Sequence, residues 1–183
     1  MKEPFKIIIS GEGGQGVQSI AKIIAYTAFL QGKKAVYVPY FSTEKRGGVT
    51  EAWAQISDTE LAYPKFAKAD LWVALSQRAV PRIFNYLKDD TKIVVNSFLV
   101  KDVSQIARWN PRQIDAGRIA KEELKKPRVF NMIMMGAMVK SIPGLDKDKF
   151  LSGIEKQFKS KYEKDPGLKD LNQKAFEIGY SLA

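Results

Sequence analysis

The feature that most constrains this fold is a glycine-rich turn placed between a strand and a helix. Lys6–Ser10 is a short β-rich run, and the turn Gly11–Gly16 follows it directly. Apolar residues then recur at helical spacing from Val17 to about Gln31. Ala35–Tyr40 is typical of a second strand. These segments predict a strand–helix–strand unit, whose crossover should be right-handed.

The rest of the chain continues this alternation. A period-two pattern predicts a strand at 51–56, and apolar runs predict buried strands at 70–76 and 91–96. Helices are expected over 77–87, 116–124, 131–141, 146–158 and 170–182. Residues 1–183 are therefore expected to form one domain of the α/β class. Its architecture would be three-layer α/β/α, with a mostly parallel Rossmann-like sheet and a helical C-terminal third.

The turn Gly11–Gly16 satisfies the pattern G-x-G-x-x-G in the expected context. Small residues let backbone amides approach a phosphate, and a helix N-terminus favours negative charge. A dinucleotide site also needs an acidic residue near the end of the second strand, to hold the ribose. That strand ends in Val38-Pro39-Tyr40-Phe41 without an acid, which argues against conventional nicotinamide or flavin dinucleotide binding. The glycines could instead only permit a tight turn and close helix–sheet packing.

A second loop, Pro39–Gly48, combines aromatic residues, an acid, two bases and paired glycines. Arg46 could bind a phosphate or carboxylate through two hydrogen bonds, and Glu44 could orient it. Gly47 and Gly48 would let a ligand or a neighbouring subunit approach the backbone. The alternative is a hairpin-like connection with a surface ion pair of little energetic value. Because ligands bind outside the carboxyl ends of parallel strands, both loops are expected at the functional edge.

Cysteine and histidine are both absent from the sequence. Without thiolates the chain alone cannot anchor an iron–sulfur cluster, and it lacks the usual zinc ligands and an imidazole base. Thirty basic residues against twenty acidic ones give a net charge of +10. This charge favours anionic partners such as phosphorylated cofactors, an acidic protein or nucleic acid. It is equally consistent with a lysine-rich, solvent-exposed surface.

Targeting and membrane signals are missing from the sequence. No apolar run reaches the roughly 18 residues that a membrane span needs, and Met1–Phe5 lacks a signal-peptide core. We therefore expect a cytoplasmic protein with no membrane partner. Only the charge motivates a nucleic-acid-binding module, because no reader helix and no Arg-paired aromatic face accompany it. No nucleic-acid partner is expected.

The pairing of the two loops resembles one family. G-x-G-G-Q-G at the first strand-to-helix turn, followed by P-Y-x-x-x-E-x-R-G-G, is similar to the gamma subunit or gamma domain of the 2-oxoacid:ferredoxin oxidoreductases. The similarity extends from about Phe5 to Gly179 and includes three further motifs, namely Ile56-Ser57-Asp58, Asn131 with Gly136-Ala137, and Asn172 with Ala175 and Gly179. The sequence E-x-R-G-G favours the 2-oxoglutarate or branched-chain type over the pyruvate type. Phe41-Ser42-Thr43 departs from the glycine and proline that the family more often has there.

The resemblance implies a subunit that is not active alone. The assembled enzyme would decarboxylate a 2-oxoacid, reduce ferredoxin and release an acyl-CoA. Thiamine diphosphate, Mg²⁺ and [4Fe–4S] clusters would belong to other subunits, so no catalytic residue or metal ligand is expected here. This chain would brace the thiamine-binding and iron–sulfur subunits and help to shape the CoA site. Its candidate contacts are Gly11, Gly13, Gly14, Gln15, Gly16, Glu44, Lys45, Arg46, Gly47 and Gly48.

Other interpretations stay open beside this one. The chain could be a stand-alone Rossmann-like nucleotide-binding protein, although the missing ribose acid argues against it. As a subunit, the isolated chain could self-associate through a surface that is normally buried in the complex. Asn131 is expected to cap its helix. The methionines at 132, 134, 135 and 138 are expected to fill the core or a subunit interface.

Overall fold

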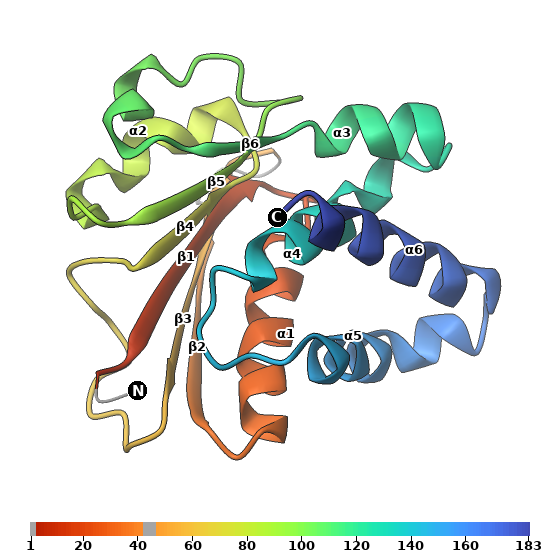
Figure 1. Cartoon of the computed structure of the whole chain (residues 1–183), viewed down its shortest axis with the longest axis horizontal. Helices are drawn as coiled ribbons and strands as arrows, with labels where there is room; N and C mark the ends of the chain where they lie inside the picture. The colour runs from red at the N-terminus through yellow and green to blue at the C-terminus, as the bar shows by residue number, and fades with distance from the viewer. Residues whose placement is uncertain (1–2, 42–46) are drawn as a thin grey trace.

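The computed structural model describes residues 3–41 and 47–183. In this part of the chain a six-stranded sheet has the order β2-β3-β1-β4-β5-β6 (Figure 1). The strands are β1 (Phe5–Glu12), β2 (Lys34–Tyr40), β3 (Val49–Ser57), β4 (Leu71–Ala74), β5 (Lys92–Asn96) and β6 (Arg112–Ile114). Strands β1, β4, β5 and β6 are parallel neighbours, whereas β3 pairs antiparallel with both β1 and β2. The predicted mostly parallel α/β fold is confirmed.

The first unit differs from a simple strand–helix–strand unit because β3 lies between β1 and β2. Strands β2 and β3 pair from Lys34 opposite Ser57 to Tyr40 opposite Glu51. An antiparallel neighbour can follow through a short loop, whereas a parallel one needs a long crossover. The loop after Tyr40 therefore returns the chain beside β2, and β3 fills the gap next to β1. The carboxyl ends of β1 and β2 still lie at the same edge of the sheet.

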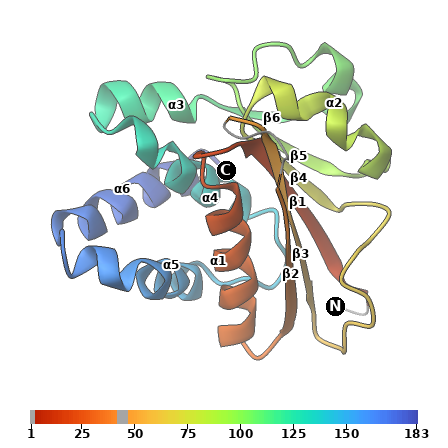
Figure 2. The same ribbon diagram turned by 180° about the vertical axis from the view of Figure 1, so that it is seen from behind.

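Helices cover both faces of the sheet, as predicted (Figures 1 and 2). One face carries α1 (Val17–Leu30), α4 (Phe130–Val139), α5 (Lys147–Tyr162) and α6 (Gly167–Ser181), and the other carries α2 (Val80–Ile83). The helix expected at 77–87 is a succession of short turns around α2, in which Pro81 lacks an amide donor. The one expected at 116–124 is α3 (Ala116–Arg118) continued by a π-helical turn. Among the described residues, no helix is long and apolar enough to cross a membrane.

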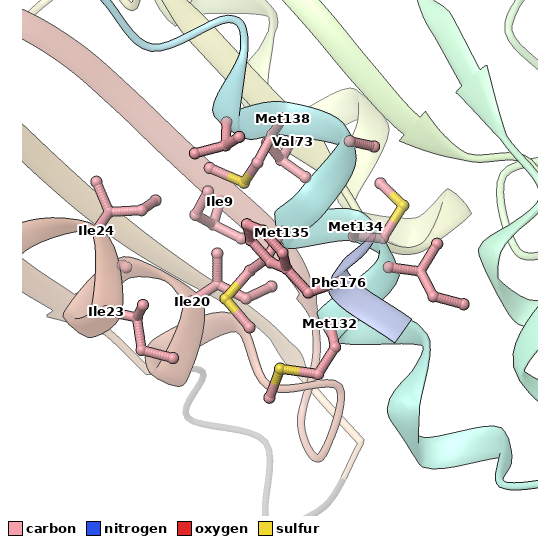
Figure 3. Packing of buried hydrophobic residues seen from close by; sticks show 14 of the residues in the cluster. Ile9, Ile20, Ile23, Ile24, Val73, Met132, Met134, Met135, Met138 and Phe176 are labelled. Carbon is pink, nitrogen blue, oxygen red and sulfur yellow. The ribbon is translucent and has the colours of Figure 1, made fainter. Parts of the chain in front are cut away.

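The sheet separates two hydrophobic cores. Ile7 and Ile9 of β1 face the cluster under α1 and α4, while Ile8 between them faces the cluster around Trp72. This alternation follows from the period of two along a strand. The methionines of α4 are all buried, and they pack with residues of α1 such as Ile20 and with Phe176 of α6 (Figure 3). The prediction that they fill the core is confirmed.

Helices α4 and α6 approach each other through two glycines. A Cβ atom on Gly136 would lie 2.0 Å from the carbonyl oxygen of Phe176. A Cβ atom on Gly179 would lie 1.9 Å from the carbonyl oxygen of Ile133. No side chain fits between backbones at this distance, so the crossing needs glycine at both positions. This close approach gives a physical reason for the glycine in each of the motifs N-x-x-x-x-G-A and N-x-x-A-x-x-x-G.

Candidate functional site

The two glycine-containing loops meet at the carboxyl edge of the sheet. The amide of Gly13 donates a 3.1 Å hydrogen bond to the carbonyl oxygen of Gly48. Strand β1 leads into the first loop and β2 into the second, so parallel strand directions bring both loops to this edge. In such sheets this is the edge where ligands bind. The candidate contacts Glu44, Lys45 and Arg46 lie outside the described residues.

Three glycines of the first loop are required by the fold itself. Gly14 and Gly16 have φ angles of 93° and 87°, a conformation that favours glycine. A Cβ atom on Gly16 would also lie 2.6 Å from the Nδ2 atom of Asn131, and one on Gly11 would lie 2.5 Å from the Oε1 atom of Gln15. A tight turn and close packing therefore account for these three positions.

The described residues give no such structural explanation for Gly13. Its φ angle lies outside the left-handed region, and among the described atoms the nearest to a Cβ placed on it is the amide nitrogen of Gly47, at 3.9 Å. This is beyond a tight contact, so the described part of the fold would accept an alanine there. A glycine that the fold does not need marks a place where a ligand or partner can approach the backbone.

Two glutamines fix the loops in place. The Oε1 atom of Gln15 accepts a 2.8 Å hydrogen bond from the amide of Glu12, which closes the first loop on itself. The side chain of Gln18, in the first turn of α1, donates to Thr50 Oγ1 and to the carbonyl oxygen of Glu51, each at 2.9 Å. Gln15 thus uses its acceptor within the loop, and Gln18 ties α1 to the start of β3.

Arg78 joins the two loops from a third segment, the short turn Gln77–Ala79 that follows β4. Its Nη1 atom donates a 2.9 Å hydrogen bond to the carbonyl oxygen of Gly47 and lies 3.5 Å from the Oε1 atom of Glu12. Arg78 was not among the predicted site residues. The signal was present, because Arg78 follows the carboxyl end of a predicted parallel strand, like the two loops.

Two buried polar side chains stand at the ends of the next strands. Ser76 follows β4 and is 4 % exposed, and Asn96 ends β5 and is fully buried. Within the described chain, neither Ser76 Oγ nor Asn96 Nδ2 has a hydrogen-bond partner. Buried polar atoms without a partner are rare, so each calls for an explanation such as a bound water, an ion or a ligand. They extend the polar character of this edge beyond the glycine loop.

An aromatic shelf borders the second loop on the sheet face opposite α1. The ring of Trp53 stacks on Tyr40 at 5.4 Å and contacts Phe66 and Tyr86, each at 4.8 Å between centroids. Phe41 begins the loop and is 73 % exposed. A large exposed aromatic ring beside a glycine loop is characteristic of a surface that contacts a partner.

Glu51 lies partly buried beside this shelf. Its Oε2 atom accepts a 3.3 Å hydrogen bond from Trp53 Nε1. Burial raises the pKa of the Glu51 carboxyl above its usual range, while Trp53 and the nearby Arg82 partly oppose the shift. The carboxyl group is therefore more easily ionised in the unfolded chain than in the folded one.

The Glu51→Gln variant is expected to gain stability relative to the parent as the pH rises. A carboxyl whose folded pKa is raised stabilises the fold below its unfolded pKa, and this contribution is lost as the pH rises through the folded pKa. Glutamine keeps an acceptor for Trp53 but does not ionise. Urea unfolding of both chains from about pH 4 to about pH 7 measures the difference. A difference independent of pH, or one that favours the parent at higher pH, would contradict the burial argument.

Asn131 does not cap its helix. Val129 occupies the cap position of α4, and no side chain caps this end. Asn131 is the second residue of the helix, and it packs against Gly16 at the start of α1. The capping prediction is therefore wrong, because this side chain fills the contact between two helix N-termini.

The groups gathered at this edge are suited to binding an anionic group. The described residues include no group of three or more acidic side chains that could hold a metal ion. They bring together backbone amides, the guanidinium of Arg78 and buried polar atoms, which suit an anionic group. The fold thus defines an α/β protein of the Rossmann-like class, with these residues gathered at the carboxyl ends of its strands.

Comparisons with known proteins place this protein within the class. The profile of the pyruvate ferredoxin/flavodoxin oxidoreductase family matches residues 6–182. The 2-oxoglutarate synthase subunit KorC of Methanocaldococcus jannaschii is 32% identical over 97% of this chain and 93% of its own length. The pyruvate synthase subunit PorC of Methanothermobacter thermautotrophicus is 32% identical over 86% of this chain and 87% of its own. The chain belongs to the pyruvate ferredoxin/flavodoxin oxidoreductase family.

Solved structures agree with this assignment. The gamma subunit of the keto/oxoacid ferredoxin oxidoreductase from Geobacter sulfurreducens superposes with a TM-score of 0.81 at 27% identity, covering 98% of both chains. The 2-oxoglutarate:ferredoxin oxidoreductase of Magnetococcus marinus, with 2-oxoglutarate, coenzyme A and succinyl-CoA bound, has the same fold over 31% of its chain, with a TM-score of 0.88 at 22% identity. The prediction of a gamma-type subunit of a 2-oxoacid:ferredoxin oxidoreductase is confirmed.

Proposed function

We propose that this chain forms part of the CoA site of a 2-oxoacid:ferredoxin oxidoreductase and braces its neighbouring subunits. The single observation that carries this proposal is the hydrogen bond from the amide of Gly13 to the carbonyl oxygen of Gly48. It joins the two motif-bearing loops at the edge where α/β sheets bind ligands. The complex as a whole converts a 2-oxoacid and CoA into an acyl-CoA and passes the electrons to ferredoxin.

The residues of this edge fit a phosphorylated ligand. CoA carries several phosphate charges, and a chain with a net charge of +10 attracts it. Gly14 and Gly16 would contact it through their backbone amides and Gln15 through its side-chain amide nitrogen, while Gly13, whose own amide donates to Gly48, would let it approach the loop. Arg78 would hold the second loop in position, and Glu44, Lys45 and Arg46 would supply charge contacts to CoA or to the adjacent subunit. Gly11, Gly47 and Gly48 would allow the close approach.

The other cofactors belong to other subunits in this proposal. Thiamine diphosphate with Mg²⁺ and the [4Fe–4S] clusters supply the decarboxylation and electron-transfer chemistry of the complex. The exposed Phe41 beside the aromatic shelf supports a contact with such a subunit. We place the chain as one domain of a cytoplasmic complex of the 2-oxoglutarate or branched-chain type. Isolated, it is expected to self-associate through the same surface.

The Gly13→Ala variant tests the CoA contact separately from the fold. We expect the KM for CoA of the assembled complex to rise about tenfold, because an added methyl group excludes a phosphate from the loop amides. The thermal unfolding temperature should stay close to that of the parent, since the nearest described atom to the new Cβ, the amide nitrogen of Gly47, is 3.9 Å away. Steady-state kinetics with varied CoA, beside differential scanning calorimetry, provides both readouts. An assembled, equally stable variant with the parental KM for CoA would refute this contact.

A further inference from the structure

The second loop leaves the sheet at the point where the backbone ladder between β2 and β3 ends. Tyr40 pairs with Glu51 in the last step of this ladder. In the described part of the chain, the two preceding residues of β3, Val49 and Thr50, pair only with β1. The open end of a two-stranded ladder frays unless other contacts close it. The base of the second loop therefore depends on side chains to hold its two ends together.

Thr50 supplies the first such contact. Its hydroxyl donates a 2.8 Å hydrogen bond to the carbonyl oxygen of Tyr40, and so joins the end of β2 to the start of β3. Thr50 is only 9 % exposed, so little water competes for this bond. In the other direction Thr50 pairs with Gly11, the first residue of the first loop. One residue thus adjoins both glycine loops.

Gln18 adds further contacts from α1. Its Nε2 atom donates to Thr50 Oγ1 and to the carbonyl oxygen of Glu51, each at 2.9 Å, and it lies 3.4 Å from the carbonyl oxygen of Tyr40. Two of these three oxygens belong to carbonyl groups, which accept hydrogen bonds but cannot donate them. The side chain must therefore face them with its nitrogen. A carboxylate of the same shape would be repelled by both carbonyl oxygens.

Tyr37 fixes the orientation of this amide. Its hydroxyl donates a 2.6 Å hydrogen bond to Gln18 Oε1, which leaves Nε2 to face the carbonyl oxygens. Burial raises the pKa of the Tyr37 hydroxyl above its usual range, which keeps it protonated as a donor. Both polar atoms of the Gln18 amide thus have partners, although the side chain is only partly buried. Such a fully satisfied network holds its members in one arrangement.

We propose that Gln18 is a positioning residue for CoA, which clasps the base of the second loop while its own helix begins at the first loop. It follows Gly16, the last residue of the first loop, by two positions, so the clasp couples the two loops through α1. This inference rests on the proposed function. It is distinct from the link made by Arg78, which holds the second loop at Gly47. Loops that are held in position before CoA arrives lose less of its binding energy to ordering.

The Gln18→Glu variant of the assembled complex tests this role. The change keeps the shape of the side chain but places a carboxylate oxygen against carbonyl oxygens that cannot donate. We expect the dissociation constant for CoA, from calorimetric titration without a 2-oxoacid, to rise about fivefold to tenfold. The KM for CoA should rise with it. The kcat at saturating CoA should stay within about twofold of the parent, because the chemistry occurs elsewhere in the complex.

Companion variants assign the effect to the hydrogen bonds. Thr50→Val should reproduce the loss of affinity, whereas Thr50→Ser, which keeps the hydroxyl, should stay within about twofold of the parent. Tyr37→Phe removes only the hydroxyl that orients the amide, and it should weaken CoA binding about twofold to threefold. Gln18→Ala should bind CoA at least as tightly as Gln18→Glu, whereas a side chain that only fills space would give the opposite order. The matched control, Gln157→Glu at an exposed position of α5, should leave the affinity unchanged.

The outcomes separate this inference from the proposed function. Parental CoA affinity in Gln18→Glu, beside a weakened Gly13→Ala complex, would overturn the role of Gln18 and leave the CoA site in place. Parental affinity in both variants would overturn the proposed function, and this inference with it. Tighter binding by Gln18→Glu than by Gln18→Ala, or a Thr50→Ser complex as weak as Thr50→Val, would show that these side chains do not act through their hydrogen bonds.

Discussion

The Gly179→Ala variant is expected to lose about 3 kcal/mol or more of folding free energy, and it will not accumulate as a folded protein if the parent is marginally stable. The new Cβ atom would lie 1.9 Å from the carbonyl oxygen of Ile133. That oxygen belongs to the backbone of α4, so the two helices must separate. Separation opens the packing around buried Phe176 and the α4 methionines. Urea unfolding followed by circular dichroism measures the loss.

Gly167→Ala is the matched control for this prediction. It makes the same chemical change in the first turn of the same helix, but its Cβ atom would meet nothing nearer than Asp165 Oδ1 at 3.5 Å. Its stability should stay within about 1 kcal/mol of the parent, because alanine is the better helix former. Equal stabilities of the Gly179 and Gly167 variants would show that α4 and α6 do not cross as closely as described.

The Arg78→Ala variant should raise the KM for CoA of the assembled complex about tenfold to thirtyfold. In the proposed CoA site Arg78 is a positioning residue, because it binds the carbonyl oxygen of Gly47 and lies beside Glu12. Without it the second loop loses a link to the first, and CoA must organise the loop when it binds. Since the chemistry occurs elsewhere in the complex, kcat at saturating CoA should change little. Steady-state kinetics with varied CoA separates the two constants.

Two further variants show whether the effect belongs to the Arg78 contacts. Arg78→Lys should restore part of the affinity, because a single ammonium group cannot reproduce the geometry of the guanidinium. Arg108→Ala removes the same charge near the opposite edge, where Arg108 stacks on Trp109, and should leave the KM unchanged. An assembled Arg78→Ala complex with parental CoA kinetics, or an equal effect of Arg108→Ala, would remove Arg78 from the CoA site.

The sequence predicts the fold well where local signals and packing agree. The strand–glycine turn–helix at the N-terminus and the apolar strands at 70–76 and 91–96 occur as expected, because burial on both faces leaves a clear pattern. The position of β3 between β1 and β2 was not predicted, since periodicity reveals a strand but not its neighbours. The broken segment around α2 was missed because its apolar spacing resembles that of a continuous helix.

The sequence predicted which loops form the candidate site, but not which residue of each loop plays which part. The motifs identified the two glycine loops, but they could not separate glycines needed for the turn from one free to face a ligand. That distinction between Gly14 and Gly13 depends on φ angles and neighbouring atoms. Arg78 and the buried Ser76 and Asn96 are distant in sequence from both motifs. Only the parallel sheet brings the ends of their strands to the same edge.

We expect this chain to work as the gamma subunit of a CoA-dependent 2-oxoacid:ferredoxin oxidoreductase. An anaerobic pull-down of the tagged full chain from its native host is the decisive experiment. We predict stoichiometric partner subunits, a brown iron–sulfur absorbance, and dye reduction that requires both CoA and a 2-oxoacid, with 2-oxoglutarate or a branched-chain 2-oxoacid preferred over pyruvate. A colourless chain without partners, or a complex that reduces dye without CoA, would show that the chain has no such role.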